Sequence, residues 1–379
     1  MLKRILPIDK EKLNSKIIRT TCLCWLPAKL LGWRMFTTYR AFPIAPVFCA
    51  FNNIPAGTHT LIFLSSVLLM IVLFILPKNK PVTIALLIVE TISCLLDQNR
   101  LQPWNYLYAF ILFIFLLNPG NRKLAIAVII FIFASTYFYS GLGKLNEGFL
   151  QTIWSKMVLH FFLGISTKTV QQGWLFYSGF CVGFFELMAG AGLLFLKTRK
   201  LSAALLIVMH LFILLFLGPL GLNYNRIIWP WNIAMIAYLY LIFFKNDPDV
   251  VPFTTLFTGW NKLVFICWGI LPAFNLPGYW DNYLSSGMYS GKLPQMLICV
   301  KDTSKCPDLK RFCKPDYRHL CNGSSTIDLQ YWALSETSVA PYPEIRVYKT
   351  LALKLQSQYP AAGFSFVYLV KGQKQQVNN

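Results

Sequence analysis

Long apolar runs separated by short polar or basic turns dominate the chain from about residue 59 to residue 275. A helix needs about 20 apolar residues to cross the hydrocarbon core of a bilayer, and flanking aromatic residues can extend a shorter run. The pattern predicts eight such helices, at 59–77, 81–96, 105–118, 124–143, 175–196, 201–218, 228–244 and 261–275. The predicted fold class is therefore an all-α polytopic membrane protein.

The turns between these runs differ in charge. Lys78–Lys80, Arg122–Lys123 and Lys197–Lys200 are basic and fall at one end of the predicted bundle, which the positive-inside rule places in the cytoplasm. The basic N-terminus is expected on the same side, so a segment within 22–52 either crosses as a ninth span or lies along the interface. The amphipathic segment 149–162 is expected to lie along the outer interface or to dip into the protein.

Three regions follow from this pattern. They are a basic N-terminus with an interfacial or first membrane segment (1–58), a transmembrane bundle (59–275) and a small extracytoplasmic C-terminal cap (276–379). Within the cap, two helices and one strand are predicted by periodicity, at 328–334, 344–358 and 363–370.

Composition supports membrane insertion. Of 379 residues, 56% are hydrophobic and 13% are charged, whereas soluble domains have about 25% charged residues. The net charge is 35 − 15 = +20, but the basic residues sit in short clusters rather than on one face, so nucleic acid is not the expected partner. We expect a multi-pass protein of the bacterial cytoplasmic membrane, or of the endoplasmic reticulum membrane in a eukaryote, with its C-terminus outside the cytoplasm.

Four of the ten cysteines lie in the C-terminal region: Cys299, Cys306, Cys313 and Cys321. On an oxidising side of the membrane they predict two disulfides, with the pairing left open. Their spacing does not match the close pairs of zinc sites, and no metal site is predicted.

Three ionisable side chains stand at the end of apolar runs or within them. Lys144 follows the run 124–143, and its ammonium either reaches the lipid headgroups or faces a protein cavity, where lost hydration makes it a candidate base. Glu186 lies within a span and must be protonated or paired there. His210 is expected to bond to a neighbouring helix as a neutral imidazole, with catalysis as the alternative.

Further polar residues map to the same end of the predicted spans as Lys144. Asp97 and Arg100 follow the second span and form either a solvated interfacial pair or a functional one. The polar group from Asn223 to Arg226 either lines the mouth of a pocket or binds headgroups. One cavity opening outward would collect several of these side chains.

Ordered blocks of the chain resemble the HTTM superfamily, which includes the vitamin K-dependent gamma-carboxylases. The blocks are Asp97-Gln-Asn-Arg-Leu-Gln-Pro-Trp104, Gly141-Leu-Gly-Lys144-Leu, Phe185-Glu186-Leu-Met-Ala-Gly190 with Val208-Met-His210, and Tyr279-Trp280-Asp-Asn-Tyr283. The resemblance covers roughly 59–300. DoxX- and MauE-like membrane proteins share something close to the lysine block.

The resemblance implies a helical bundle with an outward-opening, lipid-accessible cavity. It also implies that Lys144 matches the lysine proposed as the base acting on reduced vitamin K. The family's assisting histidine aligns with Trp104, and the large luminal domain of the carboxylases is replaced by about 80 residues. A true glutamyl carboxylase is therefore not expected.

Two functions are consistent with these observations. The first is an accessory or maturation factor for a secreted, extracytoplasmic or membrane partner protein. The alternative is a membrane enzyme that uses Lys144 as a base on a quinol-like lipid, with His210 or Tyr106 polarising an oxygen, to modify a polypeptide. Membrane lipid and a protein on the extracytoplasmic side are the expected partners.

Overall fold

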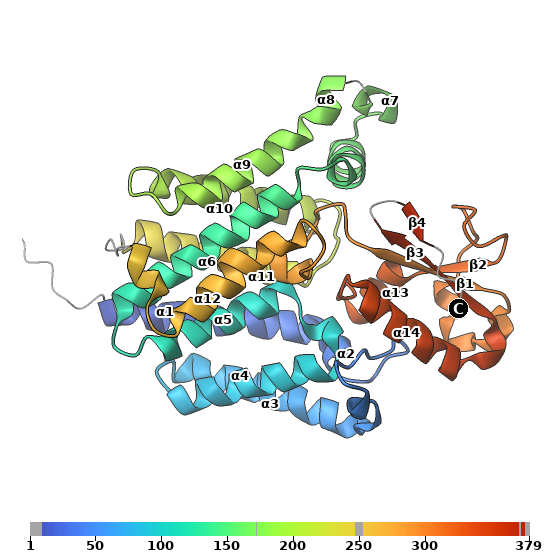
Figure 1. The fold of residues 1–379 in the computed structure, drawn as a ribbon, viewed down its shortest axis with the longest axis horizontal. Coiled ribbons are helices and arrows are strands. Elements are labelled where there is room, and N and C mark those ends of the chain that lie inside the picture. Colours follow the sequence, from blue (N-terminus) through green and yellow to red (C-terminus); the bar gives the residue numbers. More distant parts are fainter. Residues whose placement is uncertain (1–9, 172, 247–252, 371–372, 376–379) are drawn as a thin grey trace, which may run out of the picture.

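The computed structural model describes residues 10–171, 173–246, 253–370 and 373–375. The first nine residues of the expected basic N-terminus lie outside this part. Within it, a helical bundle carries a smaller α/β cap at one end (Figure 1).

Nine helical segments of the described chain run alternately between the two ends of the bundle. In chain order they are α1 (Lys10–Leu31), α3 (Ala56–Ile75), α4 (Lys80–Leu96), α5 (Pro103–Leu117), α6 (Arg122–Gly143), α9 (Gly179–Gly192), α10 (Arg199–Leu217), α11 (Ile228–Leu239) continued by the π-helical η5 (Tyr240–Phe244), and α12 (Asn261–Phe265) continued by η7 (Ile266–Ile270) and η8 (Leu271–Asn275). Each of the eight predicted runs is largely helical.

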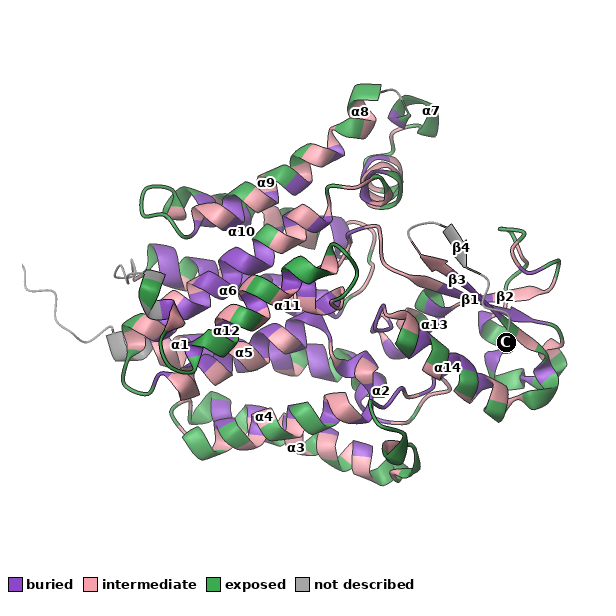
Figure 2. Ribbon diagram, viewed as in Figure 1, coloured by how far each residue is buried: buried purple, intermediate pink, exposed green. Residues whose placement is uncertain are grey.

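Four helices are long and apolar enough to cross a membrane: Ala56–Ile75, Arg122–Gly143, Gly173–Gly192 and Arg199–Leu217. Two further apolar helices of the described chain are shorter, Pro103–Leu117 and Ile228–Phe244. Exposed apolar residues recur at helical spacing on the outer helices, as at Ile84, Ile88 and Ile92 of α4. Figure 2 shows the same contrast, with exposed outer helices around a buried centre. An apolar exterior of this kind is typical of a lipid-facing surface.

The N-terminal segment starts earlier than the sequence pattern predicts. Helix α1 begins at Lys10 and packs against α3, α5 and α11, with Ile17, Trp25 and Ala28 fully buried. Its Lys29 is also buried. A charged residue lowers the mean hydropathy of the segment, so hydropathy alone does not identify this helix as part of the bundle. This helix therefore packs as part of the bundle.

Short elements connect these helices. They are α2 (Trp33–Phe36), η2 (Cys49–Asn53), η3 (Gln98–Arg100), the π-helix η4 (Phe149–Phe162), α7 (Thr167–Val170), α8 (Gly173–Tyr177), η6 (Phe253–Phe257) and η9 (Tyr283–Ser285). Side chains cap two of the long helices, because Asn79 accepts from the backbone N–H of Val82 (3.1 Å) and Asn121 accepts from that of Leu124 (3.2 Å).

The cap is not all-α: the sequence predicts one strand in it, at 363–370, and the structure has four. It contains an antiparallel sheet in the order β2-β1-β3-β4. The elements are β1 (Gln295–Val300), η10 (Thr303–Lys305), η11 (Pro307–Phe312), β2 (Ser325–Asp328), α13 (Leu329–Thr337), α14 (Ile345–Gln358), η12 (Pro360–Ala362), β3 (Phe364–Val370) and β4 (Gln373–Gln375). Strand β1 is buried on both faces, so its sequence lacks the alternation that identifies β3.

One of the two predicted disulfides is present, between Cys299 of β1 and Cys321. Cys306 and Cys313 are free thiols at the two ends of η11. Burial raises the pKa of the Cys313 thiol to about 11, so this group stays protonated and poorly nucleophilic at neutral pH.

Candidate functional site: two buried polar clusters

Lys144 and Glu186 form an ion pair between α6 and α9. The Lys144 Nζ lies 2.5 Å from Oε2 of Glu186 and 2.7 Å from the hydroxyl of Ser140. The two charged side chains are 13% and 7% exposed. Lys144 therefore neither lies free at the headgroups nor points alone into a cavity, because its charge is neutralised by a partner within the protein.

Glycines explain why the two helices come so close. A Cβ placed on Gly141 would lie 2.4 Å from the backbone nitrogen of Leu187, and one placed on Gly183 would lie 2.9 Å from the carbonyl oxygen of Gly141. Small residues permit such backbone contact between membrane-type helices. The close contact of α6 and α9 at Gly141 and Gly183 places Lys144 opposite Glu186.

His210 is held by hydrogen bonds at both ring nitrogens. Its Nε2 lies 2.7 Å from the hydroxyl of Tyr137, and its Nδ1 lies 2.7 Å from Oδ1 of Asn232. The amide of Asn232 donates to the carbonyl of Ile228 (2.8 Å), so its oxygen faces the histidine. This assigns the donor role to Nδ1 and the acceptor role to Nε2.

These groups form two bonded sets that meet along α6, where Tyr137, Ser140 and Lys144 lie three and four residues apart, and together they are called the Lys144 cluster here. The cluster links four helices through these members: Tyr137, Ser140 and Lys144 of α6, Glu186 of α9, His210 of α10 and Asn232 of α11. Three residues singled out from the sequence, Lys144, Glu186 and His210, are therefore brought together.

Other predicted residues lie elsewhere. Tyr106 stacks on Trp268 with ring centroids 4.8 Å apart, and no contact within the described chain joins it to Lys144. Trp104 is fully buried and packs edge-on against Phe36. Asn223 and Arg226 are exposed and bond to each other (3.2 Å). These four side chains do not join the Lys144 cluster.

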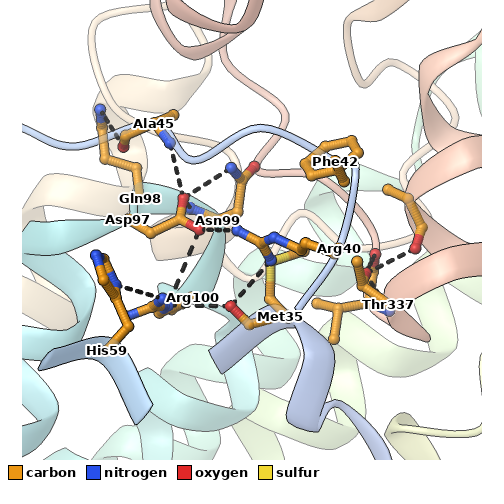
Figure 3. Close-up of polar contacts among 12 residues, drawn as sticks. Met35, Arg40, Phe42, Ala45, His59, Asp97, Gln98, Asn99, Arg100 and Thr337 are labelled. Carbon is orange, nitrogen blue, oxygen red and sulfur yellow. Dashed lines mark hydrogen bonds and ion pairs between the residues drawn. The ribbon is translucent and has the colours of Figure 1, made fainter. Parts of the chain in front are cut away.

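A second cluster centres on Asp97, and Figure 3 shows its contacts. Asp97 is fully buried rather than solvated, and its Oδ2 lies 2.5 Å from Nη2 of Arg40. Its Oδ1 accepts from the backbone of Ala45 (3.1 Å) and from the side chain of Asn99 (2.8 Å). Arg100, also fully buried, lies 3.9 Å from the same carboxylate.

Arg100 in turn binds other parts of the bundle. Its Nε donates to the carbonyl of Met35 (3.0 Å), and its Nη2 lies 2.9 Å from Nδ1 of His59. Burial lowers the pKa of Arg100 to about 10, although the nearby Asp97 opposes this shift. The guanidinium therefore stays charged at neutral pH. The name Asp97 cluster is used below for Arg40, Ala45, His59, Asp97, Asn99 and Arg100.

The Asp97 cluster lies where the bundle meets the cap. The side-chain oxygen of Asn99 accepts from the backbone N–H of Tyr342 (3.0 Å), and Gln102 donates to the carbonyl of Ala340 (3.0 Å). Nearby, Glu336 of the cap accepts from the backbone N–H groups of Ala41 (2.9 Å) and Phe42 (2.8 Å). Asp97 and Arg100 thus form part of a structural joint.

Sequence reasoning missed Arg40 and a third buried pair. Lys29 of α1 lies 2.6 Å from Glu90 of α4, and Glu90 also accepts from the hydroxyl of Ser66. A signal was available, because Glu90 interrupts the apolar run 81–96 and an intramembrane carboxylate requires a partner. Arg40 gave no such signal, since it stands in an irregular segment.

The open space beside the Lys144 cluster is small. A surface pocket lined by residues that include Tyr139, Gly143, Asn275 and Lys292 has a cavity volume of about 10 Å³, room for about one water molecule. In the part of the chain that the structure describes, no group of three or more His, Cys, Asp or Glu side chains could hold a metal ion.

Comparisons with protein-family models, with curated proteins and with solved structures gave no match.

Proposed function

We propose that this chain is a multi-pass membrane protein that acts as an accessory or maturation factor for a secreted, extracytoplasmic or membrane partner protein. In this proposal the bundle is of the HTTM, gamma-carboxylase-like type, the basic turns face the cytoplasm, and the cap lies outside it. The cap provides the surface on which the partner docks.

The state of the Lys144 cluster carries this proposal. The ammonium of Lys144 is paired with Glu186, and both ring nitrogens of His210 are bonded to protein groups. A general base needs a free acceptor within reach of its substrate. The ion pair joins α6 to α9, and the bonds of His210 join α6, α10 and α11, so these groups hold the bundle in one arrangement, as expected of a scaffold.

A membrane enzyme is the second candidate, and the convergence of Lys144, Glu186 and His210 favours it. Lys144 would act as the base on a quinol-like lipid, and it would first have to transfer its proton to Glu186 or leave that pair. The position of the family's histidine is held by Trp104, whose indole N–H has no hydrogen-bond partner within the described chain. Tyr106 is distant from this cluster, so His210 alone would assist.

A double substitution separates the two candidates. Lys144→Met alone leaves Glu186 buried without its partner, so reduced membrane abundance is expected. Lys144→Met combined with Glu186→Leu removes both charges and is expected to restore abundance, because apolar residues of similar size often replace a buried ion pair without loss. Lys144→Arg keeps the charge and serves as the control.

The readout is complementation of a deletion strain, measured together with membrane abundance. If the double variant restores both, the accessory role is supported and Lys144 is not a base. If abundance returns while complementation stays absent in the double variant and in Lys144→Arg, the enzymatic candidate replaces our proposal.

A further inference from the structure

Basic turns between helices lie at the end of the bundle opposite the cap, at the left of Figure 1. Three helix-to-helix turns meet there, at 76–80, 118–123 and 193–200, and none of them contains Asp or Glu. Together with the start of α12 they form a surface that we call the basic end. Its cations are Lys78, Lys80, Arg122, Lys123, Lys197, Arg199, Lys200 and Lys262.

Hydrogen bonds tie two of these turns to other helices at the same end. Asn118, in the second turn, exchanges two hydrogen bonds with Asn261 at the start of α12 (3.0 and 2.9 Å). Arg19 of α1 donates to the carbonyl of Phe74, just before the first turn (3.1 Å). The up-and-down order of the helices places all three basic turns at this end of the bundle (Figure 1).

Helix direction adds to this concentration. Helices α4, α6 and α10 begin at the basic end, and none has an acidic residue in its first turn. A helix N-terminus carries partial positive charge, which adds to the charge of the lysines at this end, such as Lys80, the first residue of α4. Side chains and helix dipoles at this end together favour an anion.

Apolar side chains flank the cations directly. Leu76 is 51% exposed beside Lys78 and Lys80, and Phe195 and Leu196 are 62% and 55% exposed beside Lys197. A phospholipid presents a phosphate next to acyl chains, which matches a cation next to an exposed apolar side chain. A nucleic acid or an acidic protein would leave these apolar groups in water.

We propose that the basic end binds the phosphate headgroups of anionic phospholipids. The inference rests on the membrane placement in the proposed function but not on the accessory role, because Lys144 lies at the opposite end of α6. A failure here would leave the outcome of the Lys144 and Glu186 substitutions unchanged.

The test uses full-length protein reconstituted into vesicles made of equal amounts of phosphatidylcholine and phosphatidylglycerol. After extraction in mild detergent, the two lipids retained by the protein are quantified by mass spectrometry. The wild-type protein is expected to retain phosphatidylglycerol preferentially. Since each lysine near an anionic surface contributes a factor of about five in binding, K80Q/K197Q/K262Q is expected to lose at least about tenfold of this preference.

Two further variants control for charge and folding. K301Q/K305Q/K310Q removes three exposed lysines from the cap and is expected to keep the preference. K80R/K197R/K262R keeps the charge and is also expected to keep it. Equal retention of both lipids by the wild type, or equal loss in the basic-end and cap glutamine variants, would overturn the proposal.

Discussion

Two buried clusters of this protein are each built on an ion pair with a nitrogen–oxygen distance of 2.5 Å, yet they differ in setting. The Arg40–Asp97 side chains are 1% and 0% exposed, whereas those of Lys144 and Glu186 are 13% and 7% exposed. The first pair lies beside the contacts between the bundle and the cap, and the second joins helices within the bundle. Two pairs of equal length therefore have different structural roles, which burial and connectivity decide.

Removal of Arg40 should have the largest effect. Arg40→Ala leaves Asp97 in a fully buried position with Arg100 as its nearest charge, and breaking a buried pair costs about 3–5 kcal/mol. Arg346→Ala is the matched control, because Arg346 also lies 2.5 Å from an aspartate but is 54% exposed, and such pairs contribute about 0–1 kcal/mol. Thermal unfolding in detergent measures both. A loss of stability for Arg40→Ala as small as that for Arg346→Ala would show that the joint does not depend on the Arg40–Asp97 pair.

Separation of α6 from α9 should have the next largest effect. Gly141→Ala places a Cβ against the backbone of Leu187, which cannot move aside as a side chain can, and overpacking typically costs about 1–3 kcal/mol. Gly57→Ala in α3 meets nothing within 4 Å and should be neutral or slightly stabilising, because alanine is favoured in helices. A neutral Gly141→Ala in the same unfolding measurement would refute the close contact.

Loss of the Glu186 charge should cost less. Glu186→Gln keeps the size of the side chain but removes a charge-assisted hydrogen bond, worth about 1.5–3 kcal/mol. We expect the lower end of this range, because Lys144 is partly exposed and its long side chain can reach the polar headgroups. A loss as large as that of Arg40→Ala would mean that the two pairs are equivalent after all.

Acid pH should have the smallest effect on stability, and it should act on the Asp97 cluster through the carboxylate of Asp97. Burial alone would raise the pKa of Asp97, but Arg40, Arg100 and the backbone N–H of Ala45 outweigh it and lower that pKa. Because the folded-state pKa is below the unfolded value of about 4, the carboxylate stabilises the fold fully above that pH and loses this contribution as the pH falls through the folded value. Unfolding temperatures measured from neutral to acidic pH should fall less steeply for Asp97→Asn than for the wild type. Parallel curves would contradict this assignment.

Much of the bundle could be predicted from the sequence, since long apolar runs and capped basic turns report local helix formation. The eight runs are largely helical, and the strand predicted at 363–370 corresponds to β3. The strands of the cap were harder to predict. Strand β1 is buried on both faces, so its sequence is a short apolar run without the alternation that identifies a strand. The second disulfide expected among the four cysteines is not formed, since pairing depends on distances that only the fold fixes.

The candidate sites show the same division. Sequence reasoning selected Lys144, Glu186 and His210 because ionisable groups in apolar runs are costly and need an explanation. It expected Asp97 and Arg100 to be either a solvated or a functional pair, whereas the fold buries both at the joint with the cap. Arg40 was not selected, because its role depends on a contact 57 residues away in the chain.

The sequence by itself determined that this chain forms apolar helices linked by basic turns, because these features depend on neighbouring residues along the chain. Tertiary structure alone decided which charges meet. A lysine at a helix end can bind headgroups, a ligand or a carboxylate, and the choice depends on which helix packs beside it. The glycines of α6 and α9 bring Lys144 to Glu186, and the fold buries Asp97 between Arg40 and Arg100.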